Sequence, residues 1–194
     1  MTSAPESPGD GCPGLEELTA GQVAERLGLT SHPEGGFYRE IYRCPLEVET
    51  EAGSRPLSTV IHYLLTATQP SRLHRLRSDE LWLYHAGASA QLALLGEGLT
   101  LQVLGLDSPE VLVRGGSWMG ARVLQEGQTD WGAGRAPERR WTPDRRANPE
   151  LHWTLVSCVV TPGFHFDDFE LGERASLLRA YPQARKVIHS LTAP

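Results

Sequence analysis

The sequence has few cysteines, no long apolar run and no surplus of positive charge. Its three cysteines, at positions 12, 44 and 158, are too few and too widely spaced for a disulfide framework or a paired-cysteine zinc site. No stretch approaches the roughly 20 apolar residues that a membrane-spanning helix requires. With 18 Lys+Arg against 24 Asp+Glu, the net charge of -6 opposes the phosphate backbone, so neither a membrane nor a nucleic-acid polymer is an expected partner.

The first residues also lack the features of a secretory signal. Residues 1–14 contain no basic region followed by an apolar core, and together with the cysteine usage this predicts a cytoplasmic protein. The same segment combines Pro, Gly and Ser with few large apolar groups, and cannot bury enough surface to offset the entropy of ordering. We predict a disordered tail over residues 1–14 and a single domain over residues 15–194.

The composition changes from Phe37 onward to short runs of β-branched, aromatic and aliphatic residues separated by Gly, Pro and Ser. Such spacing is typical of an all-β barrel or sandwich, in which closure removes exposed strand edges. Predicted strands cover residues 37–43, 59–65, 80–85, 90–95, 99–104, 110–114, 121–124 and 152–160. The fold class is therefore predicted to be all-β.

Short accessory helices are expected near both ends of the domain. Thr19 can cap a helix that Gly28 ends, since a short hydroxyl side chain suits the first position and glycine the left-handed last one. A second helix is predicted over residues 173–181, before Pro182 stops it. Residues 125–151, rich in Gly, Pro and Arg, predict a long rim loop or insertion.

His74 is the most informative side chain for chemistry. Glu80 follows it six residues later, across the polar turn at residues 77–79, and strand alternation then places Glu80, Trp82 and Tyr84 on one face. If that face lines a cavity, His74 can titrate near neutrality, Glu80 can orient it and Tyr84 can donate a proton. His74, Glu80 and Tyr84 are the candidate catalytic residues. The alternative is a partly exposed His–Glu pair beside ordinary packing residues.

This segment resembles the first motif of the cupin superfamily, in which a glycine-led strand carries two histidines, a glutamate and a terminal glycine. His74, Glu80 and Gly87 match that motif, whereas Thr68 stands in the place of the leading glycine. The resemblance implies a double-stranded β-helix, the cupin jelly-roll barrel, with a cavity for a small molecule.

Three separate blocks, at residues 32–40, 79–82 and 161–170, resemble the DUF985 branch of the cupins, also called cupin-5. The resemblance runs from about residue 22 to residue 182, and blocks in the right order are more specific than any single short motif. Within the last block, alternation predicts that Phe164 and Phe166 anchor the core and that Asp167, Asp168 and Glu170 are solvated. His165 stands where the family pattern usually has an acidic residue, so the resemblance implies a structural or incidental role for it.

Many cupins bind a divalent metal ion through three histidines and the glutamate, a set suited to such ions. Here Leu76 stands at the second motif histidine and Met119 at the last one, and a thioether is a poor ligand for hard ions. The resemblance therefore predicts no metal site and no cofactor. A divalent metal held by His74, Glu80 and one further histidine is the alternative.

That further histidine could be His62 or His85. By alternation His85 lies on the strand face opposite Glu80, and His62 lies opposite Ile61 and Tyr63. Each is more simply explained as a hydrogen-bonded packing or interface residue.

Three classes of function remain open. The first is a binding protein that holds a small polar or aromatic ligand in the barrel. The second is a metal-independent isomerase similar to the sugar-nucleotide 3,5-epimerases, with His74 as the base. The third is a metal-dependent cupin enzyme or a structural dimer, and a homodimer is expected in any case. The candidate ligand contacts are Tyr38, Glu40, Trp82, Trp118, Met119 and Phe164.

Overall fold

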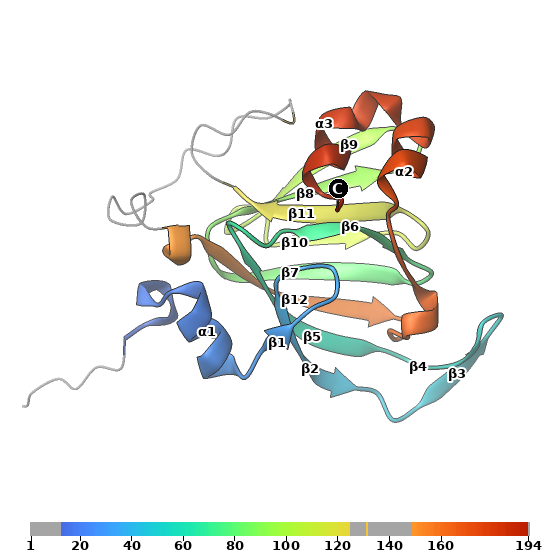
Figure 1. The fold of residues 1–194 in the computed structure, drawn as a ribbon. Helices are drawn as coiled ribbons and strands as arrows, with labels where there is room; N and C mark the ends of the chain where they lie inside the picture. The colour runs from blue at the N-terminus through green and yellow to red at the C-terminus, as the bar shows by residue number, and fades with distance from the viewer. Residues whose placement is uncertain (1–12, 125–130, 132–148, 194) are drawn as a thin grey trace, which may run out of the picture.

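The computed structural model describes residues 13–124, 131 and 149–193. The predicted tail at residues 1–14 and the predicted loop at residues 125–151 fall almost wholly outside this part of the chain. The described residues are mostly β, with short helices at both ends (Figure 1). This confirms the predicted fold class.

The first sheet contains six strands within the described residues, in the spatial order β1-β2-β5-β12-β7-β10. Every neighbouring pair is antiparallel, and β12 lies in the middle between β5 and β7. The strands are β1 (Thr30–Ser31), β2 (Phe37–Arg43), β5 (Thr59–Thr66), β7 (Asp79–Gly87), β10 (Glu110–Val113) and β12 (Trp153–Thr161). Because β12 comes late in the chain, this sheet joins both halves of the sequence.

The second sheet has the spatial order β13-β6-β11-β8-β9, again with antiparallel neighbours. Its strands are β6 (Ser71–Leu76), β8 (Ala90–Leu95), β9 (Leu99–Leu104), β11 (Trp118–Val123) and β13 (Phe169–Leu171). A separate hairpin pairs β3 (Glu47–Thr50) with β4 (Gly53–Pro56). The predicted strands are recovered, whereas β1, this hairpin and β13 were not predicted.

The helical segments lie outside the two sheets (Figure 1). They are η1 (Leu15–Glu17), α1 (Ala20–Leu27), η3 (Pro149–Leu151), η4 (Phe166–Asp168), α2 (Arg174–Ala180), η5 (Pro182–Ala184) and α3 (Arg185–Ser190). Thr19 caps α1 in a reciprocal capping box with Gln22, and Gly28 ends it in the left-handed conformation. Both predicted helices are confirmed. None of the helices in the described ranges is long and apolar enough to cross a membrane.

Strand alternation divides the core into an interior cluster and two outer ones. In β5, Tyr63 and Leu65 point into the interior cluster, whereas Leu64 packs outside with Val23 of α1. On the second sheet, Leu73 packs outward against the C-terminal helices through residues such as Ile188. Both layers of helices therefore cover the outside of the sheets, and the space between the sheets is left for the barrel interior.

Candidate functional site

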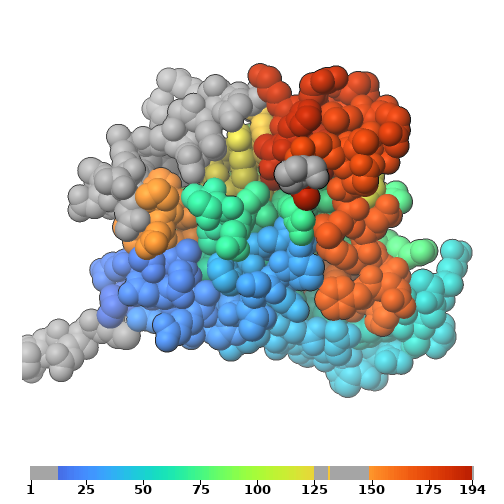
Figure 2. Space-filling view, in the orientation of Figure 1, coloured from blue at the N-terminus to red at the C-terminus, as the bar shows by residue number. Residues whose placement is uncertain are grey.

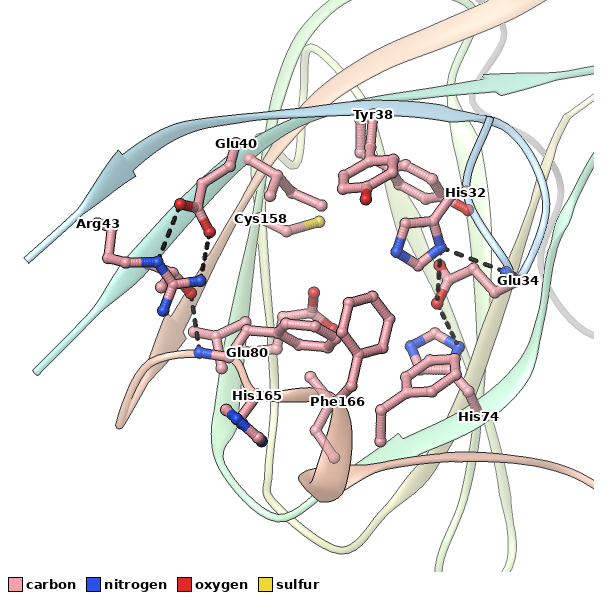
Figure 3. A pocket seen from close by; sticks show the side chains of 17 residues that line it. His32, Glu34, Tyr38, Glu40, Arg43, His74, Glu80, Cys158, His165 and Phe166 are labelled. Carbon is pink, nitrogen blue, oxygen red and sulfur yellow. Dashed lines mark hydrogen bonds and ion pairs between the residues drawn. The ribbon is translucent and has the colours of Figure 1, made fainter. Parts of the chain in front are cut away.

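A cavity of about 400 Å³ opens into the barrel between the two sheets (Figure 3). Much of its wall is aromatic, from Tyr38, Tyr63, Phe164, Phe166 and Phe169. Its polar groups include His32, Glu34, His74, Glu80 and Cys158. An apolar wall with a few convergent polar groups is the usual character of a small-molecule site.

Glu34 reaches the cavity because the loop between β1 and β2 turns sharply inward. Gly35 and Gly36 have φ angles of 117° and 68°, in the region that L side chains avoid. A Cβ at Gly35 would also collide with the carbonyl oxygen of Pro70. The glycine pair thus lets the loop pass tightly against the start of β6, with Glu34 buried at 5% exposure.

The Glu34 carboxylate is the centre of a buried polar cluster. Its Oε1 accepts a 2.7 Å hydrogen bond from the Ser71 hydroxyl. Its Oε2 lies 3.2 Å from Nδ1 of His74 and 3.7 Å from Nδ1 of His32. Buried carboxylates need such partners, because desolvation of an unpaired charge is costly. Glu34 therefore organises both histidines at one end of the cavity.

The position of the proton on His74 follows from its hydrogen bonds. Nδ1 lies 2.8 Å from the carbonyl oxygen of Arg72, which can only accept, and 3.2 Å from Glu34. Nδ1 must therefore carry the proton, and neutral His74 keeps a lone pair on Nε2. That second nitrogen is turned toward the cavity (Figure 3). His74 has the arrangement of a base held by a carboxylate.

Glu80 enters the cavity from β7 and is 5% exposed. Its Oε2 is buried without a hydrogen-bond partner among the described residues. Burial raises the pKa of Glu80 to about 7, against an opposing effect of His74, while Glu34 raises it further and Trp82 and Cys158 lower it. Burial and Glu80 also raise the pKa of the Cys158 thiol. Near neutral pH, Glu80 can therefore either donate or accept a proton.

One ion pair joins two residues of the cavity lining, and a second fixes η4, which carries the lining residue Phe166. Arg43 makes a bidentate contact with Glu40, at 2.6 and 3.0 Å. Arg55 of β4 likewise makes a bidentate contact with Asp168 of η4, at 2.6 and 3.1 Å. The Arg55 guanidinium holds the pKa of Asp168 below its usual range. Figure 2 shows the orange segment of η4 lying alongside the cyan segment around β4.

The segment at residues 164–169 differs from the prediction in two ways. Asp168 is not solvated, because Arg55 pairs with it at a buried position. Phe166 does not anchor the core, since it is 56% exposed at the cavity rim. The 3-10 turn of η4, capped by the His165 side chain, breaks the two-residue alternation on which the prediction rested. Phe164 lies on the cavity wall.

Five of the predicted site residues line the cavity: His74, Glu80, Tyr38, Glu40 and Phe164. Strand alternation placed Glu80 correctly on the inner face of β7, and β2 supplies Tyr38 and Glu40 near the mouth. His74 and Glu80 thus face the same space, as the spacing in the sequence suggested.

The other four lie away from the cavity lining. Trp82 and Met119 are packed in the interior core, and Met119 is the cross-strand neighbour of His74. Tyr84 lies further along β7 and donates a 2.6 Å hydrogen bond to the carbonyl oxygen of Gly87. Trp118 faces the C-terminal helices instead. Period-two alternation gives the face of a strand but not the depth along the barrel.

Sequence reasoning did not assign His32, Glu34, Tyr63 or Cys158 to the site. Only Tyr38 and Glu40 are predicted ligand contacts in the block at residues 32–40. Its two consecutive glycines after a His-Pro-Glu segment were the available indication, since such a pair lets the backbone approach another strand closely. Only the fold shows that this loop packs against β6.

The residues present do not fit a cupin metal centre. No group of three or more His, Cys, Asp or Glu side chains in the described ranges is arranged to hold a metal ion. Leu76 lines the cavity and Met119 is buried beside His74, so an aliphatic and a thioether side chain take the positions of two imidazoles. His62 and His85 lie on the outer side of the first sheet, where both contact the Ser157 hydroxyl.

Comparison with known proteins agrees with this architecture. A hypothetical protein from Leishmania major is 32% identical, with a TM-score of 0.76 over 91% of this chain and 100% of its own. A Shewanella oneidensis protein is 34% identical, with a TM-score of 0.73 over 91% of this chain and 99% of its own. A cupin 2 domain-containing protein from Halorhodospira halophila, 13% identical with a TM-score of 0.50, covers 85% of this chain and 88% of its own.

No curated protein matches the chain. The model of the Cupin superfamily (DUF985), in contrast, matches residues 21–172, which include the Glu34 loop, both sheets and the segment around η4. The matched range agrees with the blocks that carried the resemblance in the sequence. The chain therefore belongs to the DUF985 family of the cupin superfamily.

Proposed function

We propose that this protein binds a small molecule with an apolar body and a polar end in the barrel cavity. The observation that carries the proposal is Glu80, whose Oε2 is buried at the cavity and has no hydrogen-bond partner in the part of the chain that the structure describes. An unsatisfied buried polar group costs on the order of 1–3 kcal/mol. A ligand that hydrogen-bonds to Glu80 removes this cost, and the aromatic wall supports stacking with its apolar part.

The size and charge of the cavity narrow the ligand class. A volume of about 400 Å³ suits a compact molecule rather than a polymer, at the lower end of the range of roughly 300–1,000 Å³ for small-molecule pockets. Three glutamates, Glu34, Glu40 and Glu80, lie among the lining residues, so a strongly anionic ligand is disfavoured.

Binding can be tested by recording amide NMR spectra with a panel of uncharged aromatic ketones, amides and phenols. We expect shifts centred on β2, β5 and residues 163–169. Glu80→Gln should weaken binding, whereas Glu110→Gln on the exposed end of β10 should leave it unchanged. If no compound perturbs the cavity amides, and mass spectrometry of gently extracted protein finds no bound small molecule, the binding proposal is wrong.

A second candidate function is metal-independent isomerisation with His74 as the base. The hydrogen bond from Nδ1 to Arg72 supports it, because it leaves Nε2 free to accept a proton at the cavity. A positioned base of this kind accelerates proton transfer by roughly 10²–10⁴-fold. The test is deuterium incorporation from heavy water into a keto sugar, which should require His74. A pure binding protein would catalyse no such exchange.

We also infer a cytoplasmic location and a homodimer, which stay predictions. The cysteines that the structure describes, Cys44 and Cys158, are free thiols, which supports a reducing compartment. Light scattering coupled to size-exclusion chromatography would establish the oligomeric state, with twice the chain mass of 21.3 kDa as the expected result.

A further inference from the structure

The two histidines beside Glu34 carry their protons on different ring nitrogens. In His32, Nδ1 accepts a 3.3 Å hydrogen bond from the backbone N–H of Glu34. The distance of 3.7 Å from this nitrogen to the Glu34 carboxylate is too long for a hydrogen bond in the other direction. Neutral His32 therefore has its proton on Nε2. In His74 the proton is on Nδ1, as described above.

The neutral state of His32 is supported by its surroundings. Its side chain is 7% exposed, and burial lowers the pKa of His32, with a smaller opposing effect of Glu34 and a further lowering by His74. Its ring makes edge contacts with Tyr38 and Tyr63, at centroid distances of 4.5 and 5.6 Å. These contacts hold the ring in one orientation.

Both rings point the same way. Each directs Nδ1 toward Oε2 of Glu34, so each directs Nε2 away from it, and Figure 3 shows both second nitrogens turned into the cavity. Phe169 lies beside both rings, at centroid distances of 6.2 Å from His32 and 5.5 Å from His74. His32 therefore presents an N–H donor to the cavity, and His74 presents a basic lone pair. Both rings lie beside the apolar side chain of Phe169.

We propose that His32 and His74 act together on an enolisable carbonyl compound, with His32 as hydrogen-bond donor to the carbonyl oxygen and His74 as base toward the adjacent carbon. This inference rests on the second candidate function and names its substrate class: a compact, uncharged ketone or aldehyde with a proton on the neighbouring carbon. It also adds His32 as a catalytic residue.

The step balances without a metal or a redox partner. Nε2 of His74 forms a bond to the proton as the C–H bond breaks, and the released electron pair forms the carbon–carbon double bond. The carbonyl π pair moves onto oxygen, where the Nε2–H of His32 stabilises the developing negative charge. Glu34 stabilises the imidazolium at His74. Return of the proton to either carbon face regenerates His74 and gives exchange or isomerisation.

The proton positions can be tested directly by NMR. Long-range proton–nitrogen spectra of ¹⁵N-histidine-labelled protein distinguish the two neutral tautomers of each ring. We expect the Nε2–H form for His32 and the Nδ1–H form for His74 at pH 7.5, with assignments from the variants His32→Gln and His74→Gln. The same tautomer on both rings, or a cationic His32, overturns the proposal.

The chemistry can be tested with phenylacetone in heavy water, following loss of the protons next to the carbonyl by NMR. His32→Phe should slow exchange by roughly 10²–10³-fold, the usual effect of losing one oxyanion donor. His32→Gln, which keeps an amide N–H, should recover part of the rate and guards against misfolding of the first variant. His85→Gln, a histidine on the outer side of the sheet, should exchange at the parent rate.

The binding proposal and the enolisation proposal can be contradicted separately. If phenylacetone shifts the cavity amides but exchanges no faster than in buffer, the enolisation proposal is overturned and the binding proposal stands. If phenylacetone, cyclohexanone and 2-indanone neither bind nor exchange, a carbonyl substrate class is excluded, while binding of another compound would still support the cavity as a ligand site. Equal rates for His32→Phe and the parent would remove His32 from the reaction.

Discussion

Oε2 of Glu34 lies 3.2 Å from Nδ1 of His74, although Glu34 belongs to a loop of the first sheet and His74 to a strand of the second. Glu34 stands on the loop before β2, and His74 in β6. A carboxylate in this position fixes the ring orientation and favours the protonated form that a base reaches during proton transfer. The pair therefore links the family's Gly-Gly loop to the basic nitrogen at the cavity.

Glu34→Gln should slow His74-dependent exchange by roughly 10²-fold, because an amide cannot balance the imidazolium charge. Ligand affinity should change much less, since Oε1 and Oε2 of Glu34 are engaged by Ser71 and the histidines. The measurement is the rate of deuterium incorporation at saturating phenylacetone beside its dissociation constant. Glu170→Gln, which removes an exposed ion pair with Arg75, is the control. A parallel loss of affinity and rate would mean that Glu34 serves only to shape the site.

Gly87→Ala should destabilise the fold strongly. Gly87 has a φ of 91°, and a Cβ there would collide with the carbonyl oxygen and ring of Trp153. Gly116 has a similar φ of 83° but nothing within 4 Å of an added Cβ. We expect a loss of about 1–2 kcal/mol for Gly116→Ala from backbone strain alone, and roughly 3 kcal/mol or more for Gly87→Ala. Urea unfolding measures the free energy of unfolding of both variants. Equal losses would show that β12 can move away from an added Cβ at residue 87 at little cost.

Much of the fold could be predicted because its causes are local. The strands of the barrel are runs with two-residue alternation, and the capping box at Thr19 and the left-handed Gly28 mark α1 in the sequence itself. The hairpin of β3 and β4 was harder to predict, since β3 has no buried residue and β4 buries only Arg55 and Pro56. Arg55 of β4 also forms an ion pair with Asp168, a residue from the far end of the chain, and no local pattern encodes that contact.

The site could be predicted only in part for a related reason. His74 and Glu80 lie on adjacent segments, so their spacing shows that they can share a face. Glu34 contacts His74 only through the tertiary packing of its loop against β6, which no local period encodes. The sequence also does not show how deep in the barrel a residue lies. Tyr84 is therefore predicted at the cavity, whereas its hydroxyl hydrogen-bonds to the carbonyl oxygen of Gly87.

We expect the purified protein to contain less than one metal ion per chain. Leu76 and Met119 occupy the positions where the cupin motifs place two of the ligand histidines, and neither supplies a nitrogen donor. Elemental analysis of untagged protein should therefore find iron, manganese, nickel and zinc well below one ion per chain. The double variant Leu76→His with Met119→His, which returns imidazoles to both positions, should gain affinity for a divalent ion. One tightly held ion in the parent protein would contradict this prediction.

Glu80→Gln should change how stability depends on pH. The pKa of Glu80 is about 7 in the folded protein against 4.5 as its ordinary value, so the folded state binds this proton more tightly than the unfolded state. The associated stability is fully present below pH 4.5 and is lost as pH rises through about 7. The full difference corresponds to roughly 3 kcal/mol, at about 1.36 kcal/mol per pKa unit.

Glutamine does not titrate, so the stability of the variant should not fall with rising pH in this way. Relative to the parent, the free energy of unfolding of Glu80→Gln should rise between about pH 4.5 and pH 7.5 by up to roughly 3 kcal/mol, as measured by urea titration at several pH values. Glu110→Gln, an exposed position on β10, controls for removal of one negative charge. Parallel curves for Glu80→Gln and the parent would show that Glu80 is not a buried acid, and would remove it as a proton donor to the ligand.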